Sequence, residues 1–358
     1  MLTRKDIEHK TLFKLALSAF VLAIFVVILG AFTRLVDAGL GCPDWPGCYG
    51  HLLWPNESHE IIKAEKAFPD APVELEKTWP EMVHRYFAGT LGLFILAIVI
   101  MSIRYSTQQK KLLQPSGQAS SALASVPVKL PLFLLALVIL QAAFGMWTVT
   151  LKLWPKVVTA HLLGGFATLS LLWLLVQRLG LKQWQVSEVQ YHALRFTRPL
   201  IVFSLVVVII QIALGGWVSS NYAALACPDL PQCLGQWLPP TDFKAGFNVW
   251  QDIGPNYLGG QLDNHARTAI HLTHRIGALI VTFTLLILGF RLLSIRSAQV
   301  KSWVWWLWGV LAVQVSLGLA NILFALPLAI AVAHNAVGAV LLLTMVTITY
   351  RSFKPVRS

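Results

Sequence analysis

Residues 12–32 read LFKLALSAFVLAIFVVILGAF, an apolar run of 21 residues with a single charge at Lys14. A helix needs roughly 20 apolar residues to cross the hydrocarbon core of a bilayer, so this run predicts a membrane-spanning helix. The run is too long for the hydrophobic region of a signal peptide, and no small-residue cleavage site follows it. We therefore expect it to remain as a membrane anchor.

Seven further apolar runs can span a bilayer, at residues 84–104, 130–150, 157–178, 197–219, 271–294, 302–325 and 328–350. Each must be helical, because lipid offers the backbone no other hydrogen-bond partner. The composition agrees, with 56% hydrophobic and 12% charged residues. The sequence thus predicts an all-α polytopic membrane protein of eight transmembrane helices. The formal charge of +12 does not indicate a nucleic-acid partner, because the basic residues are spread between apolar segments.

The distribution of charge predicts the orientation. Placing both termini in the cytoplasm puts 18 of the 28 basic residues on the inner side and 13 of the 16 acidic residues on the outer side. An excess of Lys and Arg marks the cytoplasmic side of a membrane protein. The long connections 35–83 and 220–270 then face outward, and residues 108–128, rich in Gln, Ser and Ala, form a mobile inner linker.

Two outward connections carry related motifs, Cys42-Pro-Asp-Trp-Pro-Gly-Cys48 and Cys227-Pro-Asp-Leu-Pro-Gln-Cys233, at an offset of 185. Other matches follow: His84-Arg85 recurs as His274-Arg275, and Gln141, Gly145 and His161 recur as Gln314, Gly318 and His334. The chain is therefore interpreted as a tandem of two four-helix halves, residues 1–180 and 181–358. Because each half crosses the membrane an even number of times, the repeat is parallel, with its pseudo-twofold axis along the membrane normal.

All four cysteines lie in these outward connections, two in each. An oxidising compartment favours the disulfides Cys42–Cys48 and Cys227–Cys233. Metal binding and free thiols that carry electrons are the alternatives, although the spacing typical of zinc ligands is shorter.

Four histidines lie within or at the ends of predicted spans, near the outer surface: His84, His161, His274 and His334. An ionisable residue in a span is costly, which makes each a functional candidate. Two histidines on two helices of one half can supply both axial ligands of a haem. Arg85 and Arg275 are candidate partners for haem propionates, with snorkelling to the interface as the alternative. For a single His, a bond to a backbone carbonyl is also plausible.

The halves differ at one position, where Glu81-Met-Val-His84 becomes His271-Leu-Thr-His274. Residues three apart share a helix face, so Glu81 is expected to project toward the pocket of His84. A carboxylate there can move protons or stabilise positive charge. This predicts chemistry in the N-terminal half and a retained haem in the C-terminal half. The alternative is a solvated Glu81 at a helix N-terminus.

These residues, together with Thr33-Arg34-Leu35, Gly164-Gly165 and His334-Asn335, closely resemble the haem A synthase family of bacterial inner membranes and mitochondria. The resemblance implies an oxidoreductase that converts the C8 methyl group of haem O to a formyl group, giving haem A for cytochrome oxidases. It implies substrate haem at His84 and His161, a haem b cofactor at His274 and His334, and Glu81 as the essential carboxylate. An unidentified electron donor and a haem O synthase are the expected protein partners, in a bacterial inner membrane.

Two other functions use the same features. A di-haem b-type electron carrier that oxidises or reduces quinones would employ the same four histidines, with Glu81 as a proton site. A transporter is the non-enzymatic alternative, because parallel repeats and intramembrane histidines also occur there.

Overall fold

A computed structural model describes residues 4–113 and 126–357 of the chain. Within these ranges the chain forms eight long helices: α1 (Arg4–Leu35), α3 (Leu75–Leu113), α4 (Lys129–Thr150), α5 (Pro155–Gly180), α6 (Glu188–Ser220), α8 (Asn264–Leu293), α9 (Ala298–Leu323) and α10 (Leu328–Phe353). All eight are long and apolar enough to cross a membrane. The predicted all-helical, eight-span architecture is confirmed. Of the predicted inner linker, residues 114–125 lie outside the described ranges.

Several helices begin earlier than the sequence predicts, and for α3 and α8 the difference changes where the histidines lie. The spans predicted to start at 84 and 271 belong to α3 and α8, which start at Leu75 and Asn264. The expectation that His84 and His274 open their helices is therefore wrong, because each lies in the third turn. A hydropathy pattern marks only the apolar part of a helix and misses a polar first turn. The polar first turn of α8 is stabilised instead by a cap, in which Asp263 accepts a hydrogen bond from the Ala266 amide at 2.8 Å.

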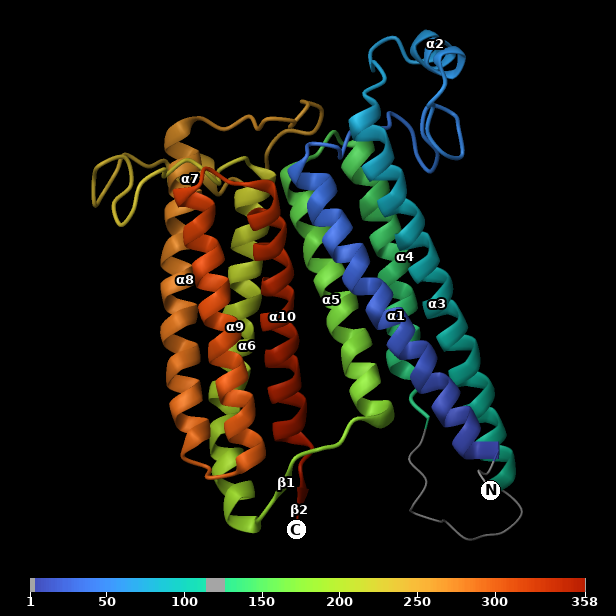
Figure 1. Cartoon of the computed structure of the whole chain (residues 1–358), viewed down its shortest axis with the longest axis vertical. Helices are drawn as coiled ribbons and strands as arrows, with labels where there is room; N and C mark the ends of the chain where they lie inside the picture. Colours follow the sequence, from blue (N-terminus) through green and yellow to red (C-terminus); the bar gives the residue numbers. More distant parts are fainter. Residues whose placement is uncertain (1–3, 114–125, 358) are drawn as a thin grey trace.

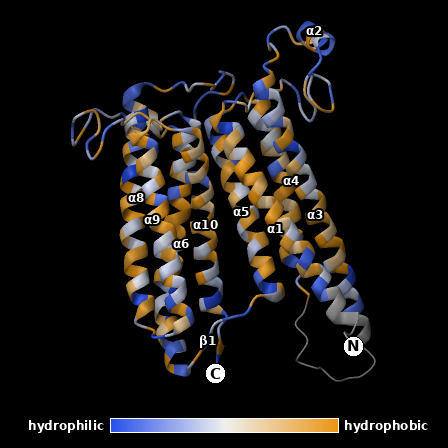
Figure 2. Cartoon of the chain, in the orientation of Figure 1, coloured by the Kyte–Doolittle hydropathy of each residue, from blue (hydrophilic) through white to orange (hydrophobic). Residues whose placement is uncertain are grey.

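The eight long helices form two groups that lie side by side (Figure 1). One contains α1, α3, α4 and α5, and the other contains α6, α8, α9 and α10; they meet where α5 packs on α6 and α10 packs on α1 and α5. Apolar residues colour the middle of the helices and polar residues gather toward their ends (Figure 2). Both termini lie at the end opposite the two long connections (Figure 1), as an even number of crossings requires.

Short elements complete the fold. Helices α2 (Ser58–Ala67) and α7 (Phe243–Gly246) lie in the two long connections. Strands β1 (Gln185–Val186) and β2 (Val356–Arg357) pair in parallel, which joins the segment between the two groups to the C-terminal end of the chain.

The two cysteine loops have the same internal contacts. Disulfides join Cys42 to Cys48 and Cys227 to Cys233, with Cα atoms 4.8 and 4.7 Å apart. The predicted pairing is thus confirmed. In each loop one Asp accepts two backbone hydrogen bonds: Asp44 from Tyr49 and Gly50, and Asp229 from Leu234 and Gly235. These matched contacts support the interpretation of a duplicated chain.

A polar cluster joins the two groups of helices near the outer end. Arg34 donates hydrogen bonds to the Tyr222 hydroxyl at 2.8 Å and to the Ser219 carbonyl. The same hydroxyl donates to Asp37 at 2.7 Å. At the offset of 185, Arg34 corresponds to Ser219 and Asp37 to Tyr222. Equivalent positions of the two halves therefore touch one another, as residues beside a pseudo-twofold axis do.

Candidate functional site

Each of the four predicted histidine ligands lies against a glycine of a neighbouring helix. The glycine leaves room for the imidazole ring, because a Cβ at that position would meet the ring carbon Cε1. That separation would be 2.9 Å for Gly30 and His84, 3.7 Å for Gly145 and His161, 3.2 Å for Gly215 and His274, and 3.2 Å for Gly318 and His334. The same ring-on-glycine contact thus occurs four times, twice in each half.

The histidines are paired within each half. His84 lies near enough to His161 for a charge on one ring to act on the other, and the same holds for His274 and His334. All four side chains are half-buried in spanning helices. In the described part of the chain, the Nδ1 atoms of His84, His161 and His334 are buried without a hydrogen-bond partner. Paired neutral imidazoles beside small residues fit the two axial positions of a haem.

Among the described residues, no three His, Cys, Asp or Glu side chains gather in a metal-binding cluster. The two histidine pairs are therefore the candidate iron sites. A haem needs only two protein ligands, because the macrocycle provides the others.

Glu81 lies directly under the first cysteine loop. It is 5% exposed, accepts a hydrogen bond from the Cys42 amide at 2.9 Å, and pairs with Arg85 at 2.6 Å. In the second half His271 occupies the same place, 3.3 Å from both the Cys227 amide and Arg275 Nε. The two residues therefore make equivalent contacts, but only Glu81 brings a carboxylate.

The two arginines bind their loops. Arg85 donates to the backbone carbonyls of Asp44, Pro46 and Gly47. Arg275 donates to those of Cys227, Asp229 and Gln232. Each guanidinium thus fixes a disulfide loop at the end of the bundle that holds a histidine pair. A contact with haem propionates stays a prediction, and most of the donors are already engaged in these loop contacts.

The first loop has a small core of its own, formed by Cys42, Cys48, Tyr49, Ala64 and Met82. Burial raises the pKa of Tyr49 to about 12, and its hydroxyl donates to the Pro72 carbonyl at 2.9 Å. This packed core covers Glu81 on the side of the first cysteine loop.

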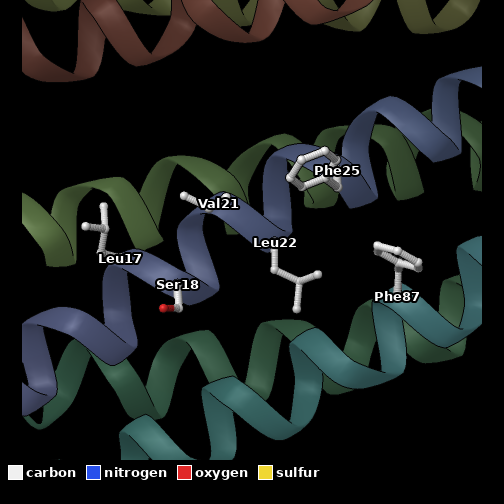
Figure 3. A pocket seen from close by; sticks show the side chains of 6 residues that line it. All are labelled: Leu17, Ser18, Val21, Leu22, Phe25 and Phe87. Carbon is white, nitrogen blue, oxygen red and sulfur yellow. The ribbon is translucent and has the colours of Figure 1, made fainter.

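An open, mostly apolar groove begins one helical turn from His84. It lies between α1 and α3, has a volume of about 490 Å³, and is lined by Leu17, Ser18, Val21, Leu22, Phe25 and Phe87 (Figure 3). From Phe25 to Leu17 the groove follows α1 for about 12 Å at the rise of an α-helix, toward the end of the molecule where the termini lie. Its volume is in the range of ligand pockets, about 300 to 1,000 Å³.

Several residues beside the histidines were not predicted from the sequence. Gly30 and Gly215 are equivalent at the offset of 185, and so are Val26 and Gln211, one turn earlier. Extending the repeat from the cysteine loops back into the preceding helices would have found all four.

Together the fold and the site define a class: a multi-pass membrane protein whose paired intramembrane histidines suit haem. The chain belongs to the cytochrome oxidase assembly protein family, whose model matches residues 13–346. The heme A synthase of Shewanella oneidensis is 47% identical over 330 residues, covering 92% of this chain and 93% of that protein. Those of Caulobacter vibrioides and Bacillus licheniformis are 26% and 25% identical over more than 90% of each chain. The predicted resemblance to haem A synthases is thus confirmed.

Proposed function

We propose that this protein is a haem A synthase, a membrane oxidoreductase that converts the C8 methyl group of haem O to a formyl group. The observation that carries the proposal is the asymmetry of two otherwise matched sites. Both halves have a histidine pair, a disulfide loop and a loop-binding arginine, but among the described residues a buried carboxylate stands beside His84 and none beside His274. The names of the similar proteins agree with this activity.

This asymmetry favours the N-terminal half as the place where haem O is oxidised. We assign His84 and His161 to the substrate haem and His274 and His334 to a resident haem b. Bound haem b would supply one-electron redox chemistry. The net conversion of a methyl group and one water to a formyl group passes four electrons to an external oxidant and releases four protons. Glu81 is the group suited to accept them, since Arg85 and the Cys42 amide hold its carboxylate in place.

The groove between α1 and α3 supports the same assignment. Haem O differs from haem b by a long isoprenoid chain, which is apolar and flexible. Five of the six groove-lining side chains are apolar, and Phe87 lies one turn from His84. The isoprenoid chain of a haem held by His84 and His161 can therefore lie in this groove. A haem b needs no such space.

The disulfides support the proposed orientation. Structural disulfides persist in oxidising compartments, so both cysteine loops belong outside the bacterial inner membrane. Because both termini lie at the opposite end of the molecule (Figure 1), they would be cytoplasmic. The electron donor is not identified, and direct transfer of substrate from a haem O synthase stays a prediction.

The test is to extract and chromatograph the haems of purified wild-type protein, Glu81→Gln and Glu81→His, each made in cells that supply haem O. Glu81→His is the matched variant, because it installs the residue that the second half has at the same place. We expect haem B with haem A in the wild type, and haem O or a hydroxylated intermediate in both variants. Haem B alone in all three would indicate an electron carrier, and protein without haem would indicate a transporter.

A further inference from the structure

Four helices place a glycine against a histidine ring. In three of them a glutamine lies one turn before the glycine. The sequences are Gln141-Ala-Ala-Phe-Gly145 in α4, Gln211-Ile-Ala-Leu-Gly215 in α6 and Gln314-Val-Ser-Leu-Gly318 in α9. In α1 the equivalent stretch is Val26-Val-Ile-Leu-Gly30. The glutamine is thus replaced by valine only beside His84.

The glutamines contact the histidine helices. Gln211 Nε2 lies 3.1 Å from His274 Nδ1 and donates to the His274 carbonyl at 2.9 Å. Gln314 Nε2 lies 3.4 Å from His334 Nε2, and the Gln141 amide packs against Gly164, one turn after His161. Within the described ranges the Nδ1 atoms of His161 and His334 have no hydrogen-bond partner, so Gln211 is the glutamine whose amide meets a histidine Nδ1.

The α1–α3 pair lacks both the glutamine and the glycine that makes room for it. In the second half Gly277 makes room for the Gln211 amide. The equivalent of Gly277, three residues after the histidine, is Phe87. His84 Nδ1 faces the Val26 backbone without forming a hydrogen bond of normal geometry. A bulky ring and a branched alkyl group thus replace a glycine and an amide.

Such an amide matters because histidines that bind metals use the second ring nitrogen for a hydrogen bond, which fixes the orientation and the basicity of the ring. Loss of that partner typically lowers metal affinity by about 10- to 100-fold. Gln211 provides this hydrogen bond for His274 in the C-terminal site, whereas Val26 leaves His84 without it in the N-terminal site. We propose that the absent amide at Val26 makes His84 a weakly held ligand, so that haem exchanges from the N-terminal site and is retained in the C-terminal site. This inference rests on the proposed function, under which substrate must enter and product must leave through the N-terminal site.

The experiment measures haem release from the purified protein to excess apomyoglobin, which traps free haem and reports it by absorbance. Two release phases are expected from the wild type. In Val26→Gln/Phe87→Gly, which rebuilds the second-half arrangement around His84, the fast phase slows by about tenfold or more. The matched control is Val26→Leu/Phe87→Gly, which changes the groove equally but adds no amide, and its fast phase should be about tenfold faster or more than that of the Gln variant.

The second half provides an independent test. Gln211→Leu should accelerate the slow phase by about tenfold. Low-spin electron paramagnetic resonance spectra recorded before release show that both histidines still bind iron in each variant. Equal release rates for the Gln and Leu variants at position 26, or one common rate for both haems of the wild type, would overturn the inference alone. Protein that purifies without any haem would overturn the proposed function and this inference with it.

Discussion

Replacing Gly30 with alanine should displace His84 without destabilising the fold. The new Cβ would lie 2.9 Å from His84 Cε1. Carbon atoms in contact prefer about 3.5 to 4.0 Å, so the ring must retreat by roughly 0.6 Å or more. Misplacement by about 1 Å typically costs catalysis about 100-fold, and we therefore expect haem A formation to fall by about 10- to 100-fold. The helix itself gains from alanine, by about 1 kcal/mol.

Gly145→Ala is the matched control. Its Cβ would lie 3.7 Å from His161 Cε1, an ordinary contact that leaves the ring where it is. The assay is the ratio of haem A to haem O extracted from membranes with equal amounts of each variant, together with the melting temperature of the purified proteins. The reasoning is refuted if Gly30→Ala converts haem O like the wild type, or if Gly145→Ala loses as much activity as Gly30→Ala.

Three further predictions concern the loops and the groove. Cys227→Ala/Cys233→Ala should lower the unfolding free energy by about 2 kcal/mol in denaturant titrations, because the disulfide closes a short loop. Hydrogen bonds from the Gly235 and Leu234 amides lower the pKa of Asp229, so the ionised form stabilises the second loop. This stabilisation is complete at neutral pH and is lost as the pH falls through the lowered pKa. Hydrogen exchange of residues 227–236 should therefore become faster at low pH. Asp229→Asn should abolish this pH dependence. Leu22→Trp fills the groove and should reduce haem O conversion by about tenfold with unchanged haem B, whereas Leu22→Ala should not.

The histidines and cysteines could be predicted from the sequence because they stand out from their surroundings. A histidine in an apolar helix is costly, which made His84, His161, His274 and His334 conspicuous. Cysteine pairs in outward connections predicted two disulfides, which the structure contains. Eight apolar runs predicted eight spanning helices for the same reason, since lipid leaves no alternative structure.

Other features depend on how distant segments meet and were not predicted. Arg85 binds carbonyls of residues about 40 positions earlier in the chain, in a loop whose path no periodicity describes. The contact of Arg34 with Tyr222 requires the two halves to be packed together. The starts of α3 and α8 were missed because their first turns carry polar and charged residues, so the hydropathy pattern does not mark the helix end. Gln211 was overlooked because glutamine in a helix has no distinctive pattern until the repeat is aligned.

The division of labour between the halves is the central claim, and the haem content of two single variants tests it most directly. His84→Ala and His274→Ala, purified from cells that supply haem O, are extracted and their haems separated by chromatography. We predict that His84→Ala retains haem B but loses haem O and haem A, and that His274→Ala loses haem B. Loss of haem B from His84→Ala, or a full complement of haem B in His274→Ala, would contradict the assignment of substrate and cofactor to the two halves.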